Sequence, residues 1–178
     1  YGCILLPPLP DAAPDVDPLD YVIFRARDAG LQVHAWINVF TAGMLAERPS
    51  HPDHVLNRRP DWVTVDRTGR SLWDYTWQEA QVYVPARMLD PGVPGVQQFV
   101  LDAALEVVDS YDVDGIHLDY VRYPSRRFGY HPESISRFMA EHGFDPMEVE
   151  QDAAAFVAVH GWEEFARRLD TWDEWQSR

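Results

Sequence analysis

The sequence predicts an α/β fold in which parallel strands are joined by helices. Two segments, 31–40 and 115–121, are rich in residues that favour β-strands. Each of them follows a segment with helical periodicity that ends at a short turn. A helix followed by a strand, repeated along the chain, is the pattern that parallel crossover connections produce. With 178 residues, of which 46% are hydrophobic, the chain is long enough for one domain with a substantial core.

The first helix is expected to begin at Pro18. Asp17 supplies an N-cap, and proline suits the first helical position because its missing N–H would be unpaired there in any case. Apolar residues then recur at helical spacing, and Gly30 is a natural end. The predicted strand 31–40 follows. The stretch before the helix is dense in proline and aspartate and is interpreted as a loop, preceded by a short strand near Cys3–Leu6.

Residues 41–90 have no long periodic segment, so we expect a long loop after the first strand, with at most a short strand at Val82–Val84. A loop of this length is unusual in a compact domain and usually has a function. It contains three tryptophans, Trp62, Trp73 and Trp77. They could form a binding platform or pack in the core, and the sequence leaves both roles open.

Helical periodicity returns in the second half of the chain, at 94–111, 132–142 and 151–172. The first of these helices leads through a short turn into the strand 115–121, which repeats the helix–strand step. Gly161 weakens the last helical pattern, because glycine disfavours helix interiors.

Charge and composition exclude several classes of protein. The formal net charge is −14, and an acidic surface repels phosphates, so we expect no nucleic-acid partner. No run of eighteen apolar residues exists, so we expect no membrane-spanning segment. The single cysteine, Cys3, excludes an internal disulfide and a cysteine-based zinc cage. Nothing in the sequence implies a cofactor.

Polar and aromatic side chains share one face of both predicted strands, because side chains alternate along a strand. They are His34, Trp36 and Asn38 on the first strand, and His117 and Asp119 on the second. Aliphatic residues occupy the opposite face, which suits packing against helices. In parallel α/β folds, ligand sites lie at the C-terminal ends of the strands. Asp119, at the end of its strand, is therefore the main candidate for a catalytic residue.

The residues after Asp119 add groups that could contact a ligand. The segment at 112–124 reads DVDGIHLDYVRYP and places Arg122 and Tyr123 on the loop after the strand. A carboxylate among aromatics and arginine can act as a nucleophile or a proton donor, depending on its neighbours. The alternative is a structural role, in which Asp119 forms a salt bridge with Arg122 and fixes the loop.

Three segments, in this order, resemble the glycosyl-hydrolase-like family 10 barrels of bacteria: GLQVHAWINVF, LDPGVPGVQQFVLD and YDVDGIHLDYVRYP. The resemblance implies a (β/α)8 TIM barrel with parallel strands and a long βα loop. It also implies a glycosidase that hydrolyses a polysaccharide or oligosaccharide, in a secreted or envelope-attached bacterial protein. A TIM barrel needs about 250 residues. Residues 1–178 are therefore expected to form a single domain that is a fragment of a larger barrel.

The resemblance also implies roles for the candidate residues. Asp119 would be the nucleophile or the general acid. The residues expected to shape the sugar subsite are Trp36, Asn38, His117, Arg122 and Tyr123. Glycoside hydrolysis normally uses two carboxylates, about 5 Å apart in retaining enzymes and about 6.5–9.5 Å apart in inverting ones. Asp66, Asp74 and Glu79 are weak candidates for the second, and a later strand outside this chain is the favoured source.

Two other functions stay open at this point. The same surface could bind sugar without cleaving it, and a second carboxylate opposite the first would distinguish the two cases. A metal-dependent hydrolase is less favoured. His51, His54, His34 and His117 could supply nitrogen ligands, but Pro52 breaks the helix that the first pair would need at this spacing. We therefore expect no metal site.

Overall fold

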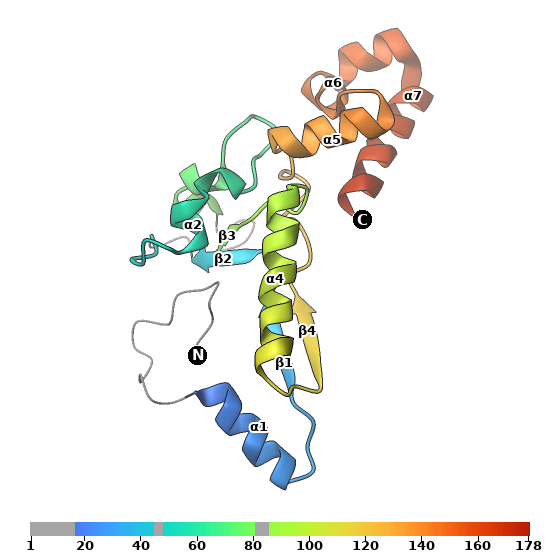
Figure 1. Ribbon diagram of the computed structural model, residues 1–178. Helices are drawn as coiled ribbons and strands as arrows, with labels where there is room; N and C mark the ends of the chain where they lie inside the picture. The colour runs from blue at the N-terminus through green and yellow to red at the C-terminus, as the bar shows by residue number, and fades with distance from the viewer. Residues whose placement is uncertain (1–16, 45–47, 81–85) are drawn as a thin grey trace.

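The computed structural model describes residues 17–44, 48–80 and 86–178 (Figure 1). The strands expected near Cys3–Leu6 and at Val82–Val84 lie outside the described residues. The elements, in chain order, are α1 (Pro18–Asp28), β1 (His34–Asn38), β2 (Thr41–Met44), α2 (Val55–Arg58), the 3-10 turns η1 (Pro60–Trp62) and η2 (Leu72–Asp74), α3 (Trp77–Ala80), β3 (Ala86–Met88), α4 (Pro94–Ser110), β4 (Gly115–Asp119), α5 (Pro132–His142), α6 (Pro146–Gln151) and α7 (Ala153–Gln176).

β1 and β4 form a parallel pair, which confirms the prediction of parallel strands in an α/β chain. The register pairs Trp36 with His117 and Asn38 with Asp119. Helix α4 runs alongside the two strands (Figure 1). At the start of the pair, the Asp114 carboxylate accepts a hydrogen bond from the backbone N–H of Val33 over 2.7 Å. Because the strands are parallel and in this register, the polar residues of both strands lie side by side, and Asn38 and Asp119 are at the C-terminal ends.

Gly115 lies under the His34 ring at the start of β4. A Cβ atom at position 115 would lie 2.6 Å from Nδ1 of His34. The glycine thus leaves space for the histidine ring above the paired strand.

A closed barrel is not seen in the described part of the chain. β2 and β3 pair with each other in antiparallel orientation, and β1 and β4 form a separate two-stranded sheet. The architecture is therefore a mixed α/β chain with one parallel and one antiparallel pair. It is compatible with a piece of a larger α/β fold.

The long connection expected at 41–90, between β1 and α4, is present, but it is not loop throughout. This segment contains short helices and strands and supplies most of the larger hydrophobic core, whose fully buried members include Leu56, Val63, Leu72 and Met88. Trp62 and Trp73 pack against this core, which favours the structural role for these two. These elements have only three or four residues each. A segment this short holds too few apolar positions to show a helical or strand period, so the hydrophobic pattern of the sequence did not indicate them.

The helices expected in the sequence are present, with small changes in their bounds. Asp17 caps α1 as predicted, accepting hydrogen bonds from the N–H groups of Leu19 and Asp20. Gly143 ends α5 in the left-handed conformation, with φ of 78°. The last predicted helix is two helices, α6 and α7, and Gly161 interrupts α7 with φ of 84°.

A second, aromatic core joins the C-terminal helices to the loop after β4. Phe138 and Trp172 meet edge to face, with ring centroids 4.8 Å apart, and Tyr130 lies 5.5 Å from Trp172. This packing holds the end of α7 close to the segment that follows Asp119. Within residues 17–44, 48–80 and 86–178, no helix is long and apolar enough to cross a membrane.

Candidate functional site

Asp119 is held from two sides at the end of β4. The indole N–H of Trp36 donates a hydrogen bond to Oδ2 over 3.2 Å. The backbone N–H of Tyr120 donates to Oδ1 over 2.7 Å. Both carboxylate oxygens therefore accept from N–H groups, an arrangement that suits the ionised form of the acid.

The predicted polar face of the sheet is confirmed in the register of the strands. The Trp36 ring lies against the His117 ring, with centroids 4.6 Å apart. The structure thus brings Trp36, His117 and Asp119 together, with Asn38 on the neighbouring strand at the level of Asp119. Trp36 is 67% exposed, so one face of its ring is open to a ligand. An exposed indole next to a carboxylate is a suitable surface for a sugar ring.

Tyr120 has a backbone conformation that non-glycine residues rarely adopt, with φ of 53°. Residues in such strained conformations cluster at functional sites. The strain occurs directly after Asp119 and turns the chain at the end of β4. The guanidinium of Arg122 lies over the Tyr120 ring, 5.1 Å from its centroid. Within the described residues no ion pair joins Asp119 to Arg122, so the structural salt bridge considered for Asp119 does not form.

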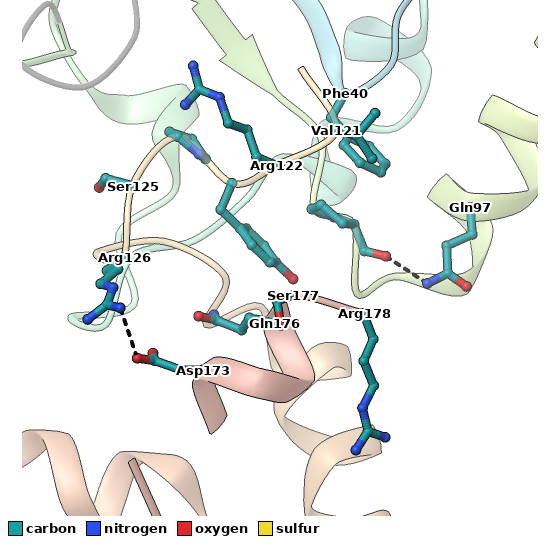
Figure 2. Close-up of a pocket in the computed structure, with 13 residues that line it drawn as sticks. Phe40, Gln97, Val121, Arg122, Ser125, Arg126, Asp173, Gln176, Ser177 and Arg178 are labelled. Atoms are coloured by element: carbon teal, nitrogen blue, oxygen red, sulfur yellow. Dashed lines mark hydrogen bonds and ion pairs between the residues drawn. The ribbon is translucent and has the colours of Figure 1, made fainter. Parts of the chain in front are cut away.

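A pocket of about 550 Å³ lies beyond the C-terminal ends of β1 and β4 (Figure 2). Phe40 lines it after β1, and residues 121–126 line it after β4. Its outer wall is the end of the chain, with Asp173 and Gln176 from α7. Its volume falls within the roughly 300–1,000 Å³ that is typical of small-molecule sites.

The pocket contains only part of the predicted sugar subsite. Arg122 and Tyr123 line it, whereas Trp36, His117 and Asp119 lie outside its lining. The candidate residues are thus divided between two neighbouring places. One is the exposed polar face of the sheet, and the other is the pocket above the strand ends.

Tyr123 is fixed in the pocket by a buried carboxylate, Asp90. The Tyr123 hydroxyl lies 3.3 Å from Oδ1 of Asp90, and the hydroxyls of Thr64 and Ser134 each donate to Asp90 over 2.8 Å. Burial raises the pKa of Asp90 despite these hydrogen bonds. Burial, together with the nearby Asp90, also raises the pKa of Tyr123 far above its usual range. The Tyr123 hydroxyl is therefore neutral at physiological pH.

A smaller cavity of about 190 Å³ adjoins this pocket. The two share five lining residues: Pro91, Gln97, Tyr123, Gln176 and Arg178. Glu141 and Trp175 line the smaller cavity, and the Trp175 indole N–H donates to Glu141 over 3.2 Å. Both cavities lie beside the last turn of α7.

Two of the three candidates for a second carboxylate make internal contacts. Asp66 is fully buried and accepts a 2.5 Å hydrogen bond from the Tyr75 hydroxyl. Glu79 accepts from both terminal nitrogens of Arg70. The hydrogen bonds from Arg70 lower the pKa of Glu79 to about 2. Asp74 is exposed.

The histidines considered as metal ligands do not assemble in the described ranges. Nδ1 of His54 accepts from the N–H of Leu56 and caps α2, and Nδ1 of His51 accepts from the N–H of Asp53. No group of three or more histidine, cysteine or acidic side chains is placed to hold a metal in the part of the chain that the structure describes.

Several residues of the pocket were not identified from the sequence. They include Phe40, Gln97, Arg126, Asp173 and Gln176, and the buried Asp90 that contacts Tyr123 was not identified either. Asp90 carried a weak signal, because it lies two residues after β3 and precedes a proline. The others come from segments far apart in the chain, and no local pattern indicates that they meet.

A family model and several curated proteins match this chain. The model of the family described as glycosyl hydrolase-like 10 matches residues 8–178. The chain is 29% identical over 118 residues to glycosyl hydrolase YngK of Bacillus subtilis, covering 65% of this chain and 20% of that protein. It is 31% identical over 127 residues to glycosyl hydrolase DigH of Escherichia coli K12, covering 64% of this chain and 25% of that protein.

A third relative is an S-layer-related protein of Niallia circulans, 28% identical over 126 residues, which are 70% of this chain and 8% of that protein. The chain thus spans a quarter or less of the length of these curated relatives. The family match covers nearly all of its residues. The chain belongs to the glycosyl hydrolase-like 10 family.

Proposed function

We propose that this chain is part of a glycoside hydrolase that cleaves O-glycosidic bonds of a polysaccharide or oligosaccharide, with Asp119 as a catalytic carboxylate. The observation that carries the proposal is the position of Asp119. It ends a parallel strand, beside an exposed tryptophan ring and below a pocket, in a chain of a glycosyl hydrolase-like family. Carboxylates at the C-terminal ends of parallel strands are well placed for catalysis.

The hydrogen bonds of Asp119 favour one of the two roles that the sequence left open. Both of its oxygens accept from N–H donors, one from Trp36 and one from Tyr120. Such donors stabilise a negative charge, which suits a nucleophile or a carboxylate that stabilises an oxocarbenium-like transition state. The proton for the leaving group would then come from a second acid, supplied by a further strand of a (β/α)8 barrel.

The remaining subsite residues would position the sugar. The exposed ring of Trp36 offers an apolar face to the C–H face of a sugar, and His117 packs behind it. Asn38, beside Asp119 on the adjacent strand, can both donate to and accept from hydroxyl groups. Arg122 and Tyr123 would contact the substrate from the pocket side.

The test is the release of reducing sugar from a panel of cell-wall and plant polysaccharides, by the full-length protein that contains this chain and by its Asp119→Asn variant. Asp114→Asn is a matched control, because Asp114 also binds a backbone N–H but lies at the opposite end of β4. We expect Asp119→Asn to abolish release and Asp114→Asn to retain it in proportion to the folded fraction. Equal losses in both variants at equal folded fraction would contradict a catalytic role for Asp119.

One observation favours a second candidate, a non-catalytic sugar-binding protein. The polar face of the described β1–β4 pair carries a single carboxylate, whereas glycoside hydrolysis normally uses two. The same panel separates the candidates. Binding of a polysaccharide without sugar release, unchanged in Asp119→Asn, would support binding alone.

A further inference from the structure

We propose that the pocket between the loop after β4 and the last turn of α7 is a separate sugar subsite, in which Gln97 and Gln176 recognise sugar hydroxyl groups. This inference rests on the proposed function for the class of ligand. It adds Gln97 and Gln176 to the pocket that Arg122 and Tyr123 also line, away from the polar face of the sheet. Two amide side chains, Gln97 and Gln176, line the pocket (Figure 2).

Both glutamines are held by hydrogen bonds from their amide nitrogens to backbone carbonyls. Nε2 of Gln97 donates to the carbonyl of Pro91 over 2.8 Å. Nε2 of Gln176 donates to the carbonyl of Phe128 over 3.2 Å. Because a backbone carbonyl only accepts, these contacts decide which end of each amide is nitrogen and which is oxygen.

The other end of each amide is its oxygen, Oε1, which can accept a hydrogen bond. Among the described residues, no group donates to Oε1 of Gln97 or of Gln176. Each oxygen is therefore held in place and can accept a hydrogen bond from a ligand without new ordering of the side chain, which lowers the cost of binding. Hydroxyl groups are the donors that a sugar presents in abundance.

The rest of the lining fits a sugar as well. Phe40 and Val121 contribute apolar surface, and the hydroxyls of Ser125 and Ser177 add short polar groups. The Arg126 guanidinium pairs with the Asp173 carboxylate over 3.4 Å (Figure 2), so part of the charge in the lining is neutralised internally. A mixture of apolar walls with a few placed polar groups is typical of small-molecule sites.

The outer wall of the pocket is clamped to the loop after β4. The Gln176 amide binds Phe128, and the ion pair of Arg126 with Asp173 joins the same two segments. Gly129 permits this approach, because its φ is +100° and an added Cβ would lie 2.2 Å from Nε2 of Gln176. The last turn of α7 is therefore built into the wall of the site.

The experiment measures binding of cellotetraose, chitotetraose and tetragalacturonic acid by isothermal titration calorimetry. The first two are neutral and the third carries carboxylates. Comparing their affinities therefore shows whether the pocket prefers neutral or acidic sugars. The proteins are this chain, Gln97→Ala, Gln176→Ala and Gln98→Ala. Gln98 is the matched control, because it neighbours Gln97 on α4 but binds Asp102 outside the pocket.

We expect at least one sugar to bind, and each pocket variant to weaken its binding by about three- to tenfold, the usual effect of one lost hydrogen bond. Gln98→Ala should bind as the unaltered chain does. Thermal melts of all four proteins establish that they are folded. If Gln176→Ala unfolds, the inference is tested with Gln97→Ala alone. Gln97 is an exposed residue of α4, so its replacement should leave the fold intact.

Three outcomes would overturn the inference: no binding of any of the three sugars, equal affinities in Gln97→Ala and the unaltered chain, or an equal loss in Gln98→Ala. Failure of the proposed function looks different. Binding that depends on the glutamines, without sugar release from any polysaccharide, would support the subsite and contradict the proposed hydrolase function. Sugar release that requires Asp119 but is unaffected by the glutamine variants would support the hydrolase function and contradict the subsite.

Discussion

The indole N–H of Trp36 donates a hydrogen bond to Oδ2 of Asp119 over 3.2 Å, although the two residues lie 83 positions apart in the sequence. The parallel register of β1 and β4 creates this contact, because it places His117 opposite Trp36 and Asp119 one alternation further on. The tryptophan therefore has two properties at once. Its ring is open to a ligand, and its N–H orients the candidate catalytic carboxylate.

Replacing Trp36 with phenylalanine separates these properties, because the ring stays and the N–H is lost. We expect kcat for sugar release to fall about tenfold or more, the effect of a lost hydrogen bond to a charged group, with little change in KM. Trp162→Phe is the control, since Trp162 is another exposed tryptophan, on α7. A Trp36→Phe variant with unchanged kcat would show that the N–H is dispensable.

Gly115→Ala should destabilise the β1–β4 pair. The new Cβ would lie 2.6 Å from Nδ1 of His34, so the ring or the strand must move. The expected cost is about 1–3 kcal/mol in the free energy of unfolding, measured by urea denaturation. Adding His34→Ala should restore most of this loss, because it removes the clashing ring. A double variant as unstable as Gly115→Ala alone would place the cause elsewhere.

Asp66 should make stability depend on pH in the acid range. Burial acts to raise its pKa, but hydrogen bonds from Thr68, Tyr75 and Arg70 outweigh this and lower the pKa below 3.8. Because the folded pKa is the lower one, the stabilisation is complete above pH 3.8 and is lost as the pH falls through the folded pKa. Unfolding free energies measured from pH 6 to pH 2 should fall more steeply for the unaltered chain than for Asp66→Asn. Parallel curves would contradict the prediction.

Tyr75 should have the opposite effect in the alkaline range. Burial, and then its hydrogen bond to Asp66, raise its pKa from 10.0 to about 12. A raised folded pKa contributes stability that is complete below pH 10 and is lost as the pH rises through about 12. Tyr75→Phe should therefore lose less stability across this interval, as followed by circular dichroism. The exposed Tyr21→Phe serves as control and should behave as the unaltered chain does.

Local patterns in the sequence were sufficient to predict the elements that position Asp119. The alternation along 31–40 and 115–121 placed Trp36 and Asp119 on one face, and their register confirms it. The Asp17 cap was also predicted correctly, because capping depends on a few neighbouring residues. Patterns of this kind involve only contacts within one element, so the order of the amino acids reveals them.

The tertiary structure alone decided the packing of residues 41–90 and the shape of the pocket. The first depends on short elements that bury Leu56 and Leu72 together without any repeat in the sequence. The second depends on Gln97 and Gln176, which lie on different helices and meet at one cavity only after the chain has folded. Contacts between distant segments are set by the burial of apolar surface and the pairing of polar groups across the whole chain, and no local pattern encodes them.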